Sequence, residues 1–225
     1  WTASDCDGDG VINSDEVTDG TDPADSCSFV LASATTAPDA AWTATDCDGD
    51  GVTNGDEVID GTDPLDNCSF VLGSISLAIT STSDCDGDGV TNADEFADGT
   101  DPFDDCSFLE SSISLSVTSV SDCDGDGVTN ADEFADGTDP ADPCSFILTS
   151  ATTAPDVSWN GADCDGDGVA NSNEITDGTN PLDSCSFRFL SITLAPDSLW
   201  LVSDCDGDGV TNATELTDAT DPLND

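Results

Sequence analysis

The sequence predicts a tandem array of small, mainly β repeats with short helical turns, and three observations lead to this fold class. The acidic nonamer DCDGDGVTN at residues 84–92 has near-copies that begin at Asp5, Asp46, Asp122, Asp163 and Asp204. The six starts lie 41, 38, 38, 41 and 41 residues apart, a spacing typical of repeat proteins. The segments between the nonamers alternate apolar and polar residues, as half-buried strands do.

The spacing divides the chain into six repeats, at residues 1–41, 42–79, 80–117, 118–158, 159–199 and a truncated 200–225. A unit of this size buries little apolar surface and usually needs a metal, a disulfide or a neighbour. Units that contact mainly their neighbours form elongated arrays, so we expect a rod or fibre. Both ends interrupt the repeat pattern, and we expect a window from a longer array.

The charge of the chain excludes several classes of function. Fifty acidic residues face one basic residue, Arg188, which gives a net charge of -49. Such a polyanion repels nucleic acids and anionic lipid surfaces, so we expect no nucleic-acid partner and no membrane insertion. His, Lys and Tyr are absent, which removes the usual general bases and imidazole ligands. We therefore expect no enzyme.

Each nonamer extends into a twelve-residue loop with the ligand spacing of an EF-hand. Carboxylates stand at positions one, three, five and twelve, and a Gly at six permits the sharp turn. Position seven would offer its backbone carbonyl, and the Asn at nine its side chain, directly or through water. Hard oxygen ligands without His or thiolate favour calcium over zinc or copper. The predicted ligands are Asp5, Asp7, Asp9, Val11, Asn13 and Glu16; Asp46, Asp48, Asp50, Val52, Asn54 and Glu57; Asp84, Asp86, Asp88, Val90, Asn92 and Glu95; Asp122, Asp124, Asp126, Val128, Asn130 and Glu133; Asp163, Asp165, Asp167, Val169, Asn171 and Glu174; Asp204, Asp206, Asp208, Val210, Asn212 and Glu215.

A second acidic segment, D-G-T-D-P-x-D in most copies, follows each loop. Its Gly is typical of a helix end and its Pro of a turn. The Asp residues form a candidate second metal site, or they bond their own backbone in turns. The candidates are Asp19, Asp22, Asp25, Asp60, Asp63, Asp66, Asp98, Asp101, Asp104, Asp136, Asp139, Asp142, Asp177, Asp183, Asp218 and Asp221.

The eleven cysteines follow the repeat, with one at loop position two and another 21 residues later. These pairs are Cys6 and Cys27, Cys47 and Cys68, Cys85 and Cys106, Cys123 and Cys144, and Cys164 and Cys185. The constant gap favours disulfides within a repeat, each contributing roughly 3 kcal/mol. Pairing between repeats, such as Cys27 with Cys47, is the alternative. Cys205 has no partner under the first rule. Paired cysteines indicate an oxidising, extracellular location.

The linkers predict strands. In the short ones, Ile75, Leu77 and Ile79 share one face, as do Ile113, Leu115 and Val117. The longer ones break at A-P-D and reach a Trp, which predicts a small hairpin. We expect the Phe of each C-S-F and the Trp residues to form the core of each repeat; carbohydrate binding by Trp is the less favoured alternative. Unpaired strand edges would invite self-association. The Ser/Thr-rich face suits O-glycosylation in a secreted protein.

The segment DCDGDGVTNADEFADGTDP resembles the bacterial thrombospondin type 3 repeat, a calcium loop without the entering EF-hand helix. The fuller pattern is similar to tandem repeats in large secreted surface proteins of gliding bacteria. This resemblance implies calcium at the loop ligands and a stalk, adhesin or fibre role. Our leading interpretation is a calcium-stiffened, self-associating filament subunit. A monomeric adhesin stalk is the alternative, and a calcium-buffering or mineral-templating polyanion is a more distant one.

Overall fold

The structure is a computed structural model that describes residues 3–224. The chain forms two compact units, Trp1–Ser116 and Val117–Asp225, each of which contains three of the acidic loops. The first five repeats are built in the same order: acidic loop, short helix, turn, and a linker that returns to its own loop. Among the described residues, no helix is both long and apolar enough to cross a bilayer.

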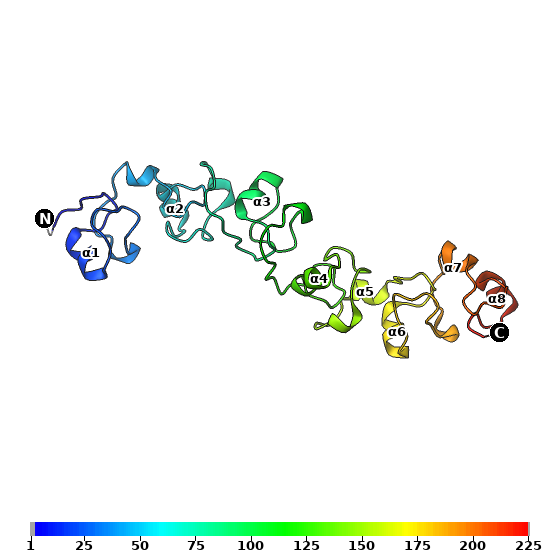
Figure 1. Cartoon of the computed structure of the whole chain (residues 1–225). Helices are drawn as coiled ribbons and strands as arrows, with labels where there is room; N and C mark the ends of the chain where they lie inside the picture. The colour runs from blue at the N-terminus through cyan, green and yellow to red at the C-terminus, as the bar shows by residue number, and fades with distance from the viewer. Residues whose placement is uncertain (1–2, 225) are drawn as a thin grey trace. The chain divides into compact units, whose positions relative to one another are not determined.

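A seven-residue helix closes each acidic loop (Figure 1). The helix starts at the Asn of loop position nine, and in three copies the preceding Thr caps it, as where Thr53 accepts a hydrogen bond from the Asp56 N–H. It ends where Gly20 and its equivalents adopt the left-handed conformation; Ala219 takes that role in the last copy. These helices are α1 (Asn13–Asp19), α2 (Asn54–Asp60), α3 (Asn92–Asp98), α4 (Asn130–Asp136), α6 (Asn171–Asp177) and α8 (Asn212–Asp218).

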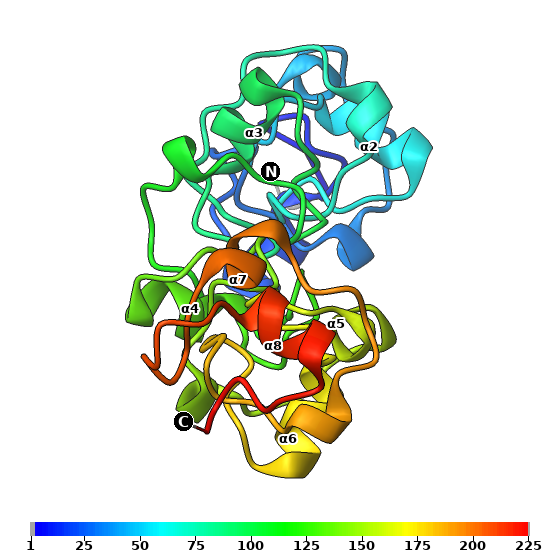
Figure 2. The same ribbon diagram turned by 90° about the vertical axis from the view of Figure 1, so that its right-hand side faces the viewer.

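The prediction of a mainly β fold is wrong. Residues 3–224 contain no strand, and neither Figure 1 nor Figure 2 draws an arrow. Where we expected strands, the backbone bonds to the repeat's own loop: the N–H groups of Ser76 and Leu77 donate to the carbonyl of Gly51. Together with the N–H groups of Thr80 and Ser81, which donate to the carbonyl of Gly49, four backbone bonds hold this segment on the loop without a neighbouring strand. The period-two pattern of Ile75 and Ile79 therefore marks an extended segment packed on a loop.

Each linker begins with a three-residue 3₁₀ helix. The longer linkers add a second short helix in place of the predicted hairpin. In these, the Asp of A-P-D caps the helix that carries the Trp: Asp156 accepts a hydrogen bond from the Trp159 N–H, and Asp197 from the Trp200 N–H. The 3₁₀ helices are η1 (Leu31–Ser33), η2 (Trp42–Ala44), η3 (Leu72–Ser74), η4 (Glu110–Ser112), η5 (Leu148–Ser150) and η6 (Phe189–Ser191); the α-helices are α5 (Val157–Gly161) and α7 (Ser198–Val202).

The predicted core of Phe and Trp is confirmed in the three repeats with long linkers. Trp159 packs edge-on against Phe146, with 5.6 Å between ring centroids, and both enclose Val128 of the acidic loop. Equivalent buried clusters are Val11, Phe29 and Trp42, and Val169, Phe187 and Trp200. The core of each of these three repeats therefore lies against loop position seven, so the loop and the linker fold together.

The disulfides join successive repeats, which overturns the favoured pairing within a repeat. The bonds Cys27–Cys47, Cys68–Cys85, Cys144–Cys164 and Cys185–Cys205 have Cα–Cα distances of 5.3 to 5.5 Å. Cys106 and Cys123 are also disulfide-bonded. Cys205 is thus paired, whereas Cys6 is a free, exposed thiol. Each of the four bonds fastens the turn of one repeat to the acidic loop of the next.

Candidate calcium sites

The first three carboxylates of the acidic loops lie together as predicted. In each of four loops, one oxygen from each of the three Asp residues lies within 4.8 Å of the others. These groups are Asp5, Asp7 and Asp9; Asp46, Asp48 and Asp50; Asp84, Asp86 and Asp88; and Asp122, Asp124 and Asp126. Such a cluster of like charges is stable only if a cation or protons compensate it.

The Asp at position one shapes the loop. Asp46 accepts hydrogen bonds from the N–H groups of Gly49 and Gly51, at 2.7 and 3.0 Å, with its two oxygens. The Asp at position five also accepts a backbone hydrogen bond within the loop: Asp50 accepts a 2.8 Å bond from the N–H of Val52. All six loops repeat both contacts. Hydrogen bonds from backbone N–H groups to these two Asp side chains therefore stabilise the conformation of the loop.

The carboxylates at positions three, five and twelve leave buried oxygens with no hydrogen-bond partner. In the first five loops each Asp at three and five leaves at least one such oxygen, and each Glu at twelve leaves both. The five Glu side chains, Glu16, Glu57, Glu95, Glu133 and Glu174, are 0% exposed. Burying unpaired carboxylates is costly, so these oxygens require a ligand. An all-oxygen set that includes a buried Glu at position twelve fits Ca²⁺.

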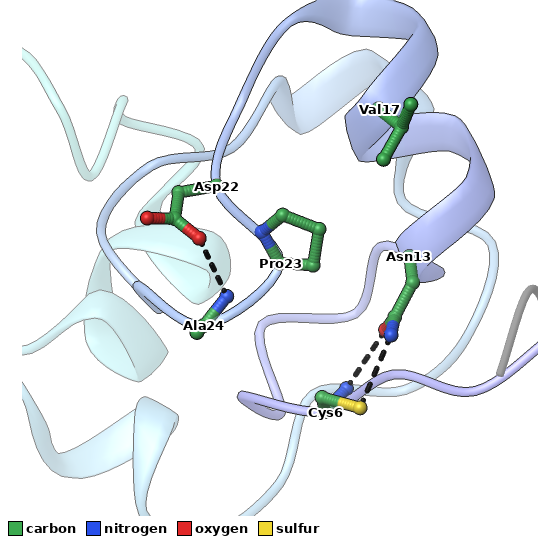
Figure 3. Close-up of a pocket in the computed structure, with 6 residues that line it drawn as sticks. All are labelled: Cys6, Asn13, Val17, Asp22, Pro23 and Ala24. Atoms are coloured by element: carbon green, nitrogen blue, oxygen red, sulfur yellow. Dashed lines mark hydrogen bonds between the residues drawn. The ribbon is translucent and has the colours of Figure 1, made fainter.

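The Asn at position nine makes hydrogen bonds within its own loop. The Oδ1 atom of Asn13 accepts a hydrogen bond from the Cys6 N–H, and its Nδ2 donates to the Cys6 sulfur, both at 3.1 Å (Figure 3). The N–H of loop position two donates to the Asn oxygen in every loop. A ligand role for this Asn, directly or through water, stays a prediction. It ties the start of the helix to the start of the loop.

Burial and crowding raise the pKa of the loop carboxyl groups. Desolvation, and then repulsion from the nearby Asp residues, raises the pKa of Glu57 to about 8 from an ordinary 4.5. The same causes raise the pKa of Glu95, Glu133 and Glu174 to about 8. Desolvation raises the pKa of Asp48 at position three to about 7. Without a cation, these sites therefore retain protons near neutral pH.

The raised pKa values predict that the calcium-free protein loses stability as the pH rises. Protonated carboxyls are favoured in the folded state, so their contribution is complete below pH 4.5 and disappears as the pH passes about 8. Urea unfolding of calcium-free protein, prepared by dialysis, should give a higher midpoint at pH 5 than at pH 8. Calcium should reverse this order, because binding requires the ionised carboxylates and releases protons. A calcium-free midpoint that rises with pH would contradict this assignment.

The Asp residues of the D-G-T-D-P-x-D segment have protein partners. Asp60 accepts a hydrogen bond from the Ser74 hydroxyl of the linker, and the equivalent bond recurs at Asp98, Asp136 and Asp177. Asp63 and Asp66 accept bonds from backbone N–H groups two residues later, as turn residues do. The turn interpretation is therefore supported, and a second ion at these residues stays a prediction.

The linker closes the loop, a contact that the sequence analysis did not predict. Asp39 donates its N–H to the Gly8 carbonyl, and Thr36 donates its hydroxyl to Asp5 at 3.3 Å. In the fourth repeat the same bond joins Thr153 to Asp122 at 3.0 Å. The recurrence of T-A-P-D in both linkers was the available signal. In the sixth loop, Asp208, Gly209 and Val210 are exposed, whereas their equivalents in the other five loops are buried.

The acidic loops contain buried carboxylate oxygens without protein partners, which is typical of a calcium-binding repeat protein. The disulfides between repeats indicate an oxidising, extracellular environment. A family model described as the bacterial TSP3 repeat matches at residues 5–26, 46–67, 84–104, 122–143, 163–184 and 204–225. These matches cover more than half of the chain, which therefore belongs to this family and confirms the resemblance. No curated protein and no solved structure matches the chain.

Proposed function

We propose that this chain is a non-catalytic structural segment of an extracellular protein, in which one calcium ion per acidic loop stiffens the repeats. The buried oxygens without partners at positions three, five and twelve carry this proposal. The carboxylate at position one stands beside them in the same cluster. A divalent cation would neutralise part of a net charge of -49 and would bind residues from both ends of the loop.

Two contacts would couple calcium binding in a loop to the rigidity of the rest of its repeat and of the preceding repeat. The Val at loop position seven packs against the Phe and Trp of the linker, as Val11 does with Phe29 and Trp42. The Cys at position two is bonded to the turn of the preceding repeat, as in Cys27–Cys47. A loop that loses its ion would therefore loosen its own core and the anchor of its neighbour.

The filament and the adhesin stalk remain two forms of this proposal. Self-association through strand edges has lost its basis, because residues 3–224 contain no strand. A stalk needs only the calcium-dependent stiffness within one chain, and we therefore favour it over edge-paired filaments. Glycosylation of the Ser/Thr-rich linkers is compatible with either form. The linkers keep many such side chains exposed, among them Thr35, Ser76 and Ser114.

Calcium titration combined with small-angle scattering tests the proposal. We expect about six ions per chain, one for each acidic loop, and a decrease in chain flexibility as they bind. Magnesium at the same concentration is the control, and it should bind more weakly because it holds its waters. Absence of saturable calcium binding, or scattering that calcium leaves unchanged, would overturn the proposal. Electron microscopy of the calcium form would separate filaments from single rods.

A further inference from the structure

The fifth linker places the one basic residue of the protein among apolar side chains. Arg188, Phe189 and Leu190 directly follow its C-S-F segment, and all three line one hollow together with Phe187. The side chain of Leu190 is 94% exposed, the highest value for a large apolar residue within the described residues 3–224. We call Arg188, Phe189 and Leu190 the Arg188 patch.

The exposure of these positions is a property of the repeat, whereas the residues in the Arg188 patch are particular to the fifth linker. At the position of Arg188 the other linkers carry aliphatic residues that are 39 to 46% exposed: Val30, Val71, Leu109 and Ile147. At the position of Leu190 they carry exposed small or polar residues: Ala32, Gly73, Ser111 and Thr149. The fifth linker therefore presents a cation and a large apolar side chain at two positions that face solvent in every linker.

Contacts with α6 orient Arg188 and leave part of its guanidinium available. Its Nη2 donates to the Asp177 backbone carbonyl at 3.1 Å, and its Nε lies 3.7 Å from the Asp177 carboxylate. These contacts do not use the two donors on Nη1, and the side chain is 65% exposed. The two carboxylates that line the hollow, Asp177 and Asp221, accept hydrogen bonds from the Ser191 hydroxyl and the Leu223 N–H. The unused hydrogen-bonding capacity of the guanidinium therefore favours a partner that supplies acceptors.

The turn of the third repeat is chemically complementary to the Arg188 patch. Phe103 is the one aromatic residue at the variable position of the D-P-x-D turns, and its ring is 45% exposed although it also contacts Phe70. The adjacent Asp104 is exposed, and its Oδ1 accepts a hydrogen bond from the Cys106 N–H. Arginine stacks on aromatic faces and pairs with carboxylates. The other turns lack an aromatic residue beside the carboxylate, since they carry Ala24, Leu65, Ala141, Leu182 and Leu223.

We propose that the Arg188 patch binds the turn at residues 101–105 of a second copy of the chain. The guanidinium pairs with the Asp104 carboxylate and stacks on Phe103, and Leu190 packs against the same ring. Charge complementarity defines this partner, because Arg188 is the one basic residue of the protein and the turn is acidic. The inference goes beyond the proposed function, which concerns stiffness within one chain, and it uses no strand edge.

Repulsion between two copies opposes this contact and determines the conditions under which it forms. Each chain carries a net charge of -49. At 0.15 M salt the Debye length is about 8 Å, so charges far from the contact are largely screened, whereas a pair inside the contact is screened much less. Because the two surfaces differ, the contact is heterologous, and its repetition leads to a ring or an open filament.

Sedimentation velocity of the intact, oxidised chain with calcium at physiological salt tests the contact. The mean sedimentation coefficient should rise with protein concentration. Arg188→Asp and Asp104→Arg should each weaken the association on the order of tenfold, because each places like charges opposite one another. An equimolar mixture of the two variants should associate again, because the unchanged turn of the first variant meets the unchanged patch of the second. Restored association would also show that both variants fold.

Asp142→Arg is the matched control for Asp104→Arg. Asp142 has the same turn position in the fourth repeat, beside Ala141, and accepts a hydrogen bond from the Cys144 N–H as Asp104 does from Cys106. This control should leave the association unchanged. Neither Arg188 nor Asp104 is a predicted ligand of an acidic loop, so calcium titration of their variants should match that of the parent. This separates a failure of the contact from a failure of the calcium sites.

Two results would contradict the Arg188 contact. One is a parent chain whose sedimentation coefficient does not change with concentration. The other is a mixture of Arg188→Asp and Asp104→Arg that associates no better than either variant alone.

Discussion

Replacement of Glu57 by Gln should lower the calcium affinity of the second loop on the order of a hundredfold, because affinity at such loops follows the number of charged ligands. Glu57 is 0% exposed, and neither of its carboxylate oxygens has a protein partner. Gln keeps the shape of the side chain and removes its charge. The remaining loops should bind as before, so a titration should show one site displaced to higher calcium concentration.

The same substitution should have the opposite effect on the calcium-free protein. Glu57 lies close enough to Asp48, Asp50 and Asp46 for each of them to raise its pKa. At pH 8 the neutral amide removes this repulsion, so calcium-free Glu57→Gln should unfold at a higher urea concentration than the parent. At pH 5 the carboxyl is protonated in the folded parent and close to its ordinary pKa of 4.5 in the unfolded parent, so the difference should be much smaller.

Asp56→Asn is the matched control for Glu57→Gln. It removes one negative charge from the adjacent residue, which accepts a hydrogen bond from the Thr53 hydroxyl at 2.8 Å. Asn173 occupies this position in the fifth loop. The control should change calcium affinity by less than about threefold, as expected for an exposed or half-exposed charge. If both variants bind calcium equally well, Glu57 is not a ligand and the site assignment is wrong.

The acidic loops could be predicted because their ligand pattern is local. Asp5, Asp7, Asp9 and Glu16 lie within twelve residues, and the positive φ angles of Gly8 and Gly10 follow from the same stretch. The helix end at Gly20 is likewise local. Each of these features depends on backbone bonds that span a few residues, so sequence spacing alone contains the information.

The partners of the linkers could not be predicted, because they are set by contacts between distant residues. Alternation at Ile75, Leu77 and Ile79 indicates an extended segment, but only the fold reveals that its N–H groups meet the carbonyls of Gly51 and Gly49. A strand would have needed a neighbour that the chain does not supply within residues 3–224. An extended segment that bonds to a strand and one that bonds to a loop show the same alternation of apolar and polar residues, so the sequence does not distinguish them.

The prediction of disulfides within a repeat was wrong for a related reason. The constant gap of 21 residues shows only that Cys47 and Cys68 both belong to the invariant part of the repeat. Pairing depends on how successive repeats pack, and there the gap varies between 17 and 20 residues. The extra residues of the long linkers form the short helices that carry Trp159 and Trp200. These helices accommodate the additional residues of the long linkers, so the Cα–Cα distances of the disulfides stay similar.

Alanine at Gly125 should destabilise the fourth repeat by roughly 3 kcal/mol, the sum of a backbone cost, a lost helix cap and disturbed packing. Gly125 has a φ of +81°, where a side chain is strained. A Cβ atom there would lie 2.6 Å from Cγ of Asp156. Asp156 donates its N–H to the Gly125 carbonyl and caps the helix that carries Trp159. Its displacement would therefore move the Trp that closes the core.

Gly207→Ala separates the backbone cost from the costs of the lost cap and the disturbed packing. Gly207 stands at the same loop position with the same φ of +81°, but no atom lies within 4 Å of its added Cβ. This variant should lose only about 1 kcal/mol, from the backbone alone. Hydrogen exchange followed by mass spectrometry can assign each loss to its repeat. Gly125→Ala should accelerate exchange across residues 144–162, whereas Gly207→Ala should act only near its own loop. Equal, purely local effects would mean that the linker does not close on the loop, and that the calcium site and the core of a repeat are independent.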